Sequence, residues 1–468
     1  MLTEFLILMK PELIITIIIF ILLFMKLGSP EPANNFLLPA INLLLLFNLV
    51  AGFFLYREGS LFGNMFETNE LVRLEKNILN LSTLIISLQS YHWLNKHKHV
   101  PEFYMLLLST LLGMFFMLSS RNILLFYLAL ELSTIPLAAL CNFDLDKRSS
   151  SEAAFKMIVS SAFSSALLLL GISLLYGATG SLDFSTIALQ LNASPLLIFA
   201  LILLLSGFGF KISAVPFHLW TADVYEGSPI AVTSWLSVIS KGSMLFVMVT
   251  LLYRFFHPLG NYWYWILFCL SVATMITGNL FAIRQQNMKR FLAFSSIAQV
   301  GFILIGLCGQ SAAGEASVIY FVLVYLLSNL GAFGVIAIVS AQTGRESIHD
   351  YKGFYKTNPA LGWILAISLF SLAGIPPTAG FFGKFFLLLA GAGKGNYWLI
   401  TIAALNMVVS LYYYLNIIRA IFMDSNDLPV EKIKIGLQPK IALAICIAGI
   451  VITGLASGAY NYIYSLVK

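Results

Sequence analysis

The chain has 468 residues, of which 59% are hydrophobic and 10% are charged, and its mean hydropathy is +0.89. Soluble domains carry about 25% charged residues, so this composition excludes a soluble enzyme. It predicts an all-α protein that crosses a membrane many times. The excess of 27 basic over 21 acidic residues is modest, and it indicates unequal loops rather than binding to nucleic acid.

The four cysteines lie far apart in apolar surroundings, and the sequence contains no CxxC pair. This spacing excludes the usual zinc, haem-attachment and iron–sulfur motifs. We therefore expect the chain to hold no metal and no cofactor of its own. If electrons move in this system, they move in another chain.

The apolar segments predict about fourteen membrane-spanning helices, because a helix needs about 20 mainly apolar residues to cross a bilayer. The first segment has an early acidic residue and no small-residue cleavage site, so we expect a retained helix rather than a signal peptide. The expected spans lie near 11–28, 36–55, 75–93, 101–119, 122–141, 152–176, 195–213, 229–253, 261–283, 289–308, 315–341, 358–391, 397–421 and 439–465.

Basic residues collect in alternate loops, so one side of the protein is richer in lysine and arginine than the other. The positive-inside rule places the richer side in the cytoplasm and both termini outside. This assignment leaves four basic residues inside spans and one acidic residue near the middle of a span. They are Lys156, Lys211, Lys241, Lys384 and Glu131.

The stretch GFGFKISAVPFHLWTADVYEGSPIAVTSWLSVISK, at 207–241, predicts a helix that is broken within the membrane. Pro216 lacks an N–H group and its ring clashes with the preceding turn, so the helix should end or kink there. Lys211 precedes the break, and Lys241 lies in the apolar helix that follows. An ionisable residue inside a membrane indicates a functional site by default, so the two lysines predict a path for charge.

A second break is expected within 358–391, which is too long for one straight span. Pro376 and Pro377 lie midway, and Lys384 follows about two turns later. Five helices separate the two breaks, and an odd number inverts equivalent helices, as in the inverted repeats of transporters. The predicted organisation is three N-terminal helices (1–100), two inverted five-helix units (101–253 and 254–425) and a last helix (426–468).

Glu131 is surrounded by apolar residues. It is either a proton-relay carboxylate or a static group, and a static group is either a partner in an ion pair or a carboxylic acid that stays neutral. We favour the relay, because apolar residues can replace a purely structural pair. At Lys211 the negative end of the half-helix dipole favours the cation, whereas desolvation favours the neutral amine. Movement of a nearby Glu131 away from Lys211 would then release the lysine's proton.

Lys241 lies about a third of the way into its helix, so snorkelling to the interface competes with a relay role. Lys384 has better support because it follows the second break. His218 either shuttles protons, since its reference pKa is near neutrality, or bridges the first break by hydrogen bonding.

Ser295 and Gln299 are candidates for a hydrated route in the second unit. Gln299 follows Lys289 at the spacing that separates Glu131 from Arg121, which makes it a candidate counterpart of that glutamate. Three other charged residues are expected to be solvated. Lys156 should snorkel, and the favoured interpretation of Asp223 and Glu226 is that of loop acids.

Two long motifs resemble one known family. PFHLWTADVYEGSPIAVTSWLSVISKG and DYKGFYKTNPALGWILAISLFSLAGIPPTAGFFGKF are similar to signatures of the antiporter-like membrane subunits of respiratory complex I, most of all its N-type members. The resemblance extends from about residue 100 to 425. It departs from the family at Ala222, where a proline is expected, and at Ile230 and Ala231, which replace a more polar pair.

The resemblance implies a proton-relay role for four residues, which match the family's charged positions: Glu131, Lys211, Lys241 and Lys384. It also implies a place in a bacterial inner membrane, with periplasmic termini, lipid around the chain and subunits of the K and M types beside it. The family's flavin, iron–sulfur clusters and quinone belong to partner subunits. The expected function is translocation of protons, driven by distant quinone reduction.

Two other functions stay open at this stage. The first is a cation/proton antiporter, either alone or as a subunit of a larger antiporter. The second is a structural membrane-arm subunit whose charges only hold the assembly together.

Overall fold

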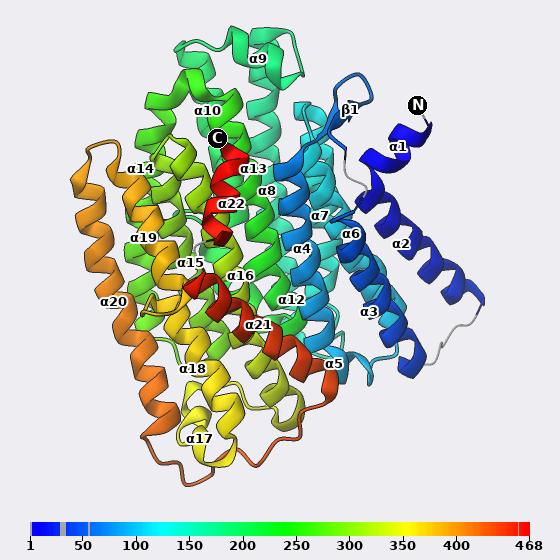
Figure 1. Cartoon of the computed structure of the whole chain (residues 1–468), viewed down its shortest axis with the longest axis vertical. Coiled ribbons are helices and arrows are strands. Elements are labelled where there is room, and N and C mark those ends of the chain that lie inside the picture. Colours follow the sequence, from blue (N-terminus) through cyan, green and yellow to red (C-terminus); the bar gives the residue numbers. More distant parts are fainter. Residues whose placement is uncertain (1, 29–33, 55–56, 457) are drawn as a thin grey trace.

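The computed structural model describes residues 2–28, 34–54, 57–456 and 458–468, and it is a bundle of helices with one small hairpin (Figure 1). The hairpin is antiparallel, and Gly59 pairs with Thr68 at its open end. The N-terminal elements are α1 (Leu2–Leu8), α2 (Lys10–Gly28), α3 (Asn34–Ala51), β1 (Gly59–Leu61), β2 (Phe66–Thr68), α4 (Glu70–Gln89) and α5 (Tyr91–Leu94).

The middle of the chain contains the first broken helix, which consists of α10 and α11, and a long helix with two π-helical turns. Its elements are α6 (Val100–Ser119), α7 (Ile123–Cys141), α8 (Arg148–Thr179), α9 (Phe184–Gln190), α10 (Pro195–Ile212), α11 (Leu219–Gly227), α12 (Ile230–Trp235), η1 (Leu236–Ser240), α13 (Lys241–Thr250) and η2 (Leu251–Phe255).

The last part of the chain contains the second broken helix, which consists of α18 and α19. Its elements are η3 (His257–Leu259), α14 (Gly260–Ile283), α15 (Met288–Cys308), α16 (Ala312–Thr343), η4 (Ile348–Tyr351), α17 (Phe354–Thr357), α18 (Pro359–Ala373), α19 (Ala379–Ala392), α20 (Tyr397–Phe422), α21 (Leu437–Leu455) and α22 (Gly458–Val467).

The multi-spanning class predicted from the sequence is confirmed. Within the described residues, eleven helices are long and apolar enough to cross a membrane, and three more are apolar but shorter. The count of fourteen spans stays a prediction. The segment expected as one last span, 439–465, contains two helices, because α21 ends at Leu455 and α22 begins at Gly458.

Burial separates a central layer from a lipid-facing one. Helices α15 and α16 and the long segment 230–255 are almost entirely buried. The outer helices α2, α8, α20 and α21 instead expose large apolar side chains, such as Phe20, Phe163 and Val408. Apolar side chains on both faces are what a helix needs when it contacts protein on one side and lipid on the other. The polar residues considered below therefore lie in the centre of the bundle.

Two stretches of the chain share unusual local features. Asn122 caps α7, and Asn287 caps α15, each with a side-chain oxygen that accepts two backbone N–H groups. Each cap also pairs with a distant strand-like residue, Asp183 for Asn122 and Ser347 for Asn287. The helices α8 and α16 both have 32 residues and end at a left-handed glycine. The local structure of the first stretch thus recurs about 165 residues later.

The N-terminal helices are joined by a buried ion pair that the sequence analysis did not predict. Lys76, which the sequence analysis did not count among the basic residues within spans, lies inside α4 with 1% of its surface exposed. Its Nζ lies 2.5 Å from Oε1 of Glu12 on α2, which is equally buried. No local pattern predicts the pair, because its two members are 64 residues apart.

We expect Lys76→Met to destabilise the protein by about 3–5 kcal/mol, because it leaves the Glu12 carboxylate buried without its partner. The double variant Glu12→Gln/Lys76→Met should recover most of this loss, since a buried pair can often be replaced by uncharged residues. Thermal unfolding in detergent measures both. An equal loss of stability in the single and double variants would contradict this account.

Candidate functional site

The first predicted break is present. Helix α10 ends at Ile212, and Ser213 adopts a left-handed conformation with φ of 62°. Pro216 follows, and α11 begins at Leu219. The break is stabilised by protein groups, because Trp220 Nε1 on α11 donates to the Phe210 carbonyl at 3.3 Å. Non-helical backbone at membrane depth requires such partners.

The second predicted break has the same form with a different stabilising side chain. Helix α18 ends at Ala373, Gly374 has φ of 86°, and α19 begins at Ala379. The Nζ of Lys384 donates to the carbonyls of Leu372 and Ala373, at 2.9 and 3.1 Å. A cation at this end of a helix is stabilised by the helix dipole. Lys384 therefore closes the break from the second half-helix, as Trp220 does in the first.

Glu131 and Lys211 lie on neighbouring helices of the first half and are each held by a hydroxyl group. Ser165 on α8 donates to Oε1 of Glu131 at 2.5 Å. The Lys211 ammonium donates to Thr134, which lies one turn after Glu131 on α7. Among the described residues no direct ion pair joins Glu131 to Lys211, although the two charges are close enough to interact electrostatically.

Lys241 lies at the centre of the bundle with 1% of its surface exposed, so it does not snorkel. Its Nζ donates to Ser296 Oγ on α15 at 2.6 Å. The same Nζ lies 5.5 Å from the ring centre of Tyr225 on α11. Lys241 thus contacts both halves of the chain. It follows a π-helical turn, a feature that frequently marks functional sites.

Ser295 and Gln299 form a polar chain toward Lys384. Ser295 Oγ and the Tyr414 hydroxyl are 2.5 Å apart, and Gln299 Nε2 donates to the same hydroxyl at 3.1 Å. Gln299 also donates to the Leu372 carbonyl at 2.9 Å, the group to which Lys384 donates. Tyr414 was not singled out from the sequence, because it lies in a run of three tyrosines on an otherwise apolar helix.

The two asparagine caps align the halves of the chain differently from the earlier comparison, which matched the spacing of Arg121 and Glu131 with that of Lys289 and Gln299. Glu131 lies nine residues after the cap Asn122, and Ser296 lies nine residues after the cap Asn287. Counted from the caps, Ser296 lies at the position that corresponds to Glu131, and the match of Gln299 with Glu131 stays a prediction. This register is consistent with the role of Ser296 as a partner of a buried lysine, since Lys241 donates to it.

Three charges expected to be solvated form an ion cluster at one end of the bundle. Lys156 contacts Asp223 at 2.6 Å, and Arg290 contacts both Asp223 and Glu226 at 2.7 Å. The three side chains are paired, but each is also more than a third exposed, so the expectation that Lys156 snorkels and that Asp223 and Glu226 are solvated stays a prediction. The cluster ties α8 and α15 to the second half of the broken helix, α11.

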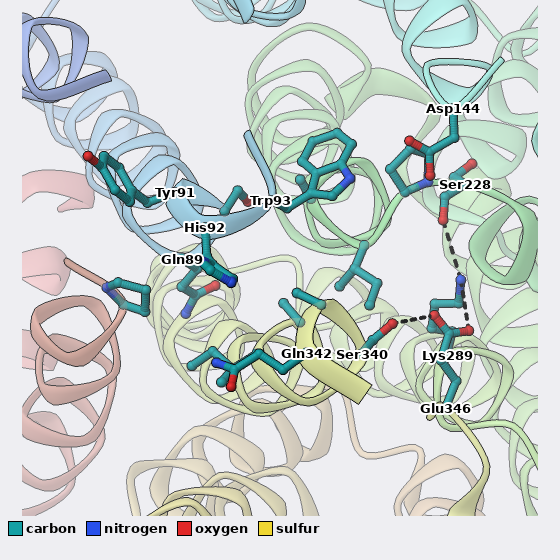
Figure 2. Close-up of a pocket in the computed structure, with 18 of the residues that line it drawn as sticks. Gln89, Tyr91, His92, Trp93, Asp144, Ser228, Lys289, Ser340, Gln342 and Glu346 are labelled. Atoms are coloured by element: carbon teal, nitrogen blue, oxygen red, sulfur yellow. Dashed lines mark hydrogen bonds and ion pairs between the residues drawn. The ribbon is translucent and has the colours of Figure 1, made fainter. Parts of the chain in front are cut away.

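A cavity of about 710 Å³ opens beside this cluster, between the ends of α5, α12, α16 and α21 (Figure 2). In Figure 2, Lys289 bridges Glu346, 3.1 Å away, and the Ser228 carbonyl, 3.4 Å away. Asp144 also lines the cavity. Partial burial acts to raise the pKa of Asp144, but hydrogen bonds from His97 and Lys147 hold it below its usual value.

His218 directly precedes α11, and its Nδ1 is buried without a hydrogen-bond partner among the described residues. It lies within electrostatic reach of Lys241. The structure therefore brings the predicted residues together in the centre of the bundle, in two groups. Glu131 and Lys211 form the first group. Lys241, Ser295, Gln299 and Lys384 form the second, and His218 lies near Lys241.

A membrane bundle with two broken helices and a central row of lysines belongs to the antiporter-like class of membrane proteins. Residues 120–410 match the family described as NADH:quinone oxidoreductase/Mrp antiporter, TM, so the chain belongs to this family.

Curated relatives are similar over most of their length. The NADH-quinone oxidoreductase subunit N of Phocaeicola vulgatus is 43% identical, over 97% of this chain and 97% of its own. The NAD(P)H-quinone oxidoreductase subunit 2 of a Picosynechococcus species is 40% identical, over 76% of this chain and 69% of its own.

Solved structures are similar in fold. A chain of respiratory complex I from Thermus thermophilus is 29% identical, with a TM-score of 0.81 over 96% of this chain and 97% of that one. A chain of the Mrp complex from a Dietzia species has a TM-score of 0.87 over 98% of this chain and 96% of its own. Its identity of 20% supports the fold alone.

Trp220→Phe should keep the ring that packs on Phe210 but lose the hydrogen bond that closes the first break. We expect the protein to lose about 1 kcal/mol of stability, the usual net value of one hydrogen bond. Thermal unfolding in detergent measures the change, and Trp398→Phe, at an exposed tryptophan, is the matched control. An unchanged unfolding temperature for Trp220→Phe would contradict the role given to its Nε1.

Proposed function

We propose that Glu131, Lys211, Lys241 and Lys384 relay protons through the membrane in this chain. The chain is a proton-translocating membrane-arm subunit of an NADH:quinone oxidoreductase, as its family and its full-length relatives indicate. The observation that carries the relay is the central row itself. Four ionisable side chains on α7, α10, α13 and α19 each contact a polar group on a neighbouring segment, and Lys241 and Lys384 are buried whereas Glu131 and Lys211 are half-buried.

The first step of the relay is a change in the separation of Glu131 and Lys211. When the carboxylate approaches, it stabilises the charged lysine, and when it withdraws, desolvation favours release of the proton. Glu131 and Lys211 now contact the neutral hydroxyl groups of Ser165 and Thr134. Replacing these two hydrogen bonds by a direct contact between the carboxylate and the ammonium costs little free energy. The pair is therefore able to convert a shift of charge in a neighbouring subunit into a change of proton affinity.

The later steps use the second group of residues. A proton released at Lys211 reaches Lys241, and the route from Lys241 to Lys384 follows Ser296, Ser295, Tyr414 and Gln299. The Leu372 carbonyl accepts but cannot donate, so water must complete the last step. Moving one charge against 100 mV costs about 2.3 kcal/mol, and redox chemistry in partner subunits supplies this energy.

Two inverted five-helix units, 101–253 and 254–425, are the framework of this proposal. The recurrence of the asparagine caps, of the 32-residue helices and of the breaks supports the repeat. The fifth and tenth predicted spans run in opposite directions if every span crosses, which supports the inversion. Residues 1–100 and 426–468 flank the two units.

The proposal extends to the surroundings of the chain. We place it in a bacterial inner membrane with both termini outside, because the cavity side carries the larger number of basic residues. Its neighbours are expected to be subunits of the K and M types. Flavin, iron–sulfur clusters and quinone are assigned to partner subunits. No group of three or more metal-ligating side chains lies together in the described ranges.

Lys211→Ala tests the proposal in the assembled complex. We expect NADH:quinone activity and proton pumping, recorded in the same membrane vesicles, to fall together by roughly tenfold or more, as on loss of an acid–base group. Lys394→Ala, at an exposed loop lysine, is the matched control. Glu131→Ala should resemble Lys211→Ala.

The other outcomes separate the alternatives. Wild-type pumping by an assembled Lys211→Ala complex would overturn the relay. Loss of assembly in every charge variant, with normal pumping by whatever assembles, would favour a structural subunit. Sodium-dependent proton movement by the purified chain in liposomes would favour a cation/proton antiporter.

A second test uses two neighbouring tyrosines. Tyr414 bridges Ser295 and Gln299, whereas the hydroxyl of Tyr413 donates to Asn279 at 3.0 Å, outside the proposed route. We expect Tyr414→Phe to slow coupled pumping by about fivefold, because it removes one hydrogen-bonded link. Tyr413→Phe should pump as the wild type does. Equal rates in the two variants would contradict this route.

A further inference from the structure

A second large groove lies on the lipid-facing side of the protein and takes no part in the relay. It has a volume of about 650 Å³ and lies between α18 and α20, which pack against each other at the edge of the bundle (Figure 1). Arg419 is the one charged residue among its described lining residues. The rest of the lining is mainly apolar and comes from both helices: Trp363 and Phe370 on α18, and Tyr412, Leu415 and Phe422 on α20.

The groove has the length of one membrane leaflet. Its lining extends along α20 from Tyr412 to Met423, and these eleven residue steps of 1.5 Å cover about 16 Å. The hydrocarbon core of a bilayer is about 30 Å thick, so one leaflet accounts for about 15 Å. At the deep end, Phe370 lies three residues before the end of α18 at the second break. The groove therefore runs from one membrane surface to about the middle of the bilayer.

Aromatic side chains gather at the shallow end of the groove. The ring centre of Phe422 lies 5.0 Å from that of Trp363 and 4.8 Å from that of Tyr355 on α17. Tryptophan and tyrosine are enriched where a membrane meets water, because their rings are amphipathic. Lys434, in the loop that follows α20, lines the 710 Å³ cavity. The shallow end thus lies at the level of the lipid headgroups, on the cavity side of the protein.

Two basic side chains at this end are only weakly neutralised. The Arg419 side chain is 63% exposed, and its Nε lies 3.6 Å from Oδ1 of Asp424. An exposed ion pair of this kind contributes little to stability. Lys356, on α17, is exposed and has no ion-pair partner among the described residues. The N–H group of Gly353 donates to the Ala420 carbonyl at 2.9 Å, which holds this basic segment against α20.

We propose that the groove between α18 and α20 binds one anionic phospholipid from the leaflet on the cavity side. An acyl chain lies in the groove between Trp363 and Tyr412, and the phosphate accepts hydrogen bonds from Arg419 and Lys356. Two cations beside one carboxylate leave an excess of positive charge, so a headgroup with net negative charge is favoured over a zwitterionic one. The site does not depend on the proposed relay, since none of its residues belongs to it.

A lipid fits this groove better than a helix of a neighbouring subunit does. Packed helices have axes about 8–10 Å apart, so the space between α18 and α20 is narrower than a helix, which measures about 10–12 Å across with its side chains. The groove is also apolar along its length and charged only at its shallow end. This pattern is that of one acyl chain below one phosphate group, and a guanidinium can bind a phosphate through two parallel hydrogen bonds.

Photocrosslinking in the assembled complex identifies the occupant directly. A p-benzoylphenylalanine in place of Leu415, illuminated in vesicles of phosphatidylethanolamine with a minor share of phosphatidylglycerol, should form lipid adducts that mass spectrometry identifies. We expect phosphatidylglycerol to be enriched about fivefold over its share of the membrane, the effect of one basic residue near the surface. The same probe in place of Leu280, an exposed residue of α14 outside the groove, should give adducts in the membrane's own proportions.

Charge variants test the headgroup contact. Arg419→Gln should remove most of the enrichment at position 415, whereas Arg419→Lys should keep part of it, because lysine retains the charge but not the planar fork. Arg284→Gln, at an exposed arginine at the end of α14, is the matched control and should leave the enrichment unchanged. Adducts in bulk proportions in the wild type would overturn the preference for an anionic lipid. Adducts with a polypeptide would show that another subunit covers the groove and would overturn the lipid site.

Thermal unfolding of the purified, delipidated complex gives a second measurement that needs no probe. Added phosphatidylglycerol should raise the unfolding temperature of the wild type more than that of Arg419→Gln, because a ligand that binds only the folded state stabilises it. Phosphatidylethanolamine should have a smaller effect on the wild type than phosphatidylglycerol has. Equal shifts in the wild type and Arg419→Gln on addition of phosphatidylglycerol would contradict the proposed site.

Discussion

The free-energy cost of an unpaired polar group away from water governs most of this structure. Each charge and each freed backbone group in the centre of the bundle must find a partner, because lipid offers none. The breaks show this most directly. Trp220 and Lys384 donate to the last carbonyls of α10 and α18, so each half-helix end is stabilised by a side chain from its own second half.

The same constraint organises the central row. Lys211 and Lys241 each donate to a hydroxyl, and Lys384 donates to carbonyl oxygens, so none of the three is paired with a carboxylate. Neutral partners satisfy the hydrogen bond of an ammonium without fixing its charge. The Glu12–Lys76 ion pair instead joins α2 and α4 through opposite charges. The charges of Glu12 and Lys76 thus join two helices, whereas the three lysines of the central row have neutral partners and can gain or lose a proton.

Much of this site can be predicted from the sequence, because a proline or a charged residue within an apolar segment is a strong local signal. Pro216, Pro376 and the buried lysines were located in this way. Contacts between distant segments were not. The ion pair of Asp223 with Arg290 and the bridge made by Tyr414 depend on how helices meet, and no spacing along the chain encodes them.

The position of Lys384 has a mechanical consequence. Its ammonium group is both a candidate proton carrier and the cap of α18, so the same two carbonyls are held tightly when it is charged and weakly when it is neutral. Proton occupancy and the stiffness of the helix end are therefore thermodynamically linked. A neighbour that strains this joint changes the lysine's affinity for its proton, and a proton that leaves loosens the joint in return.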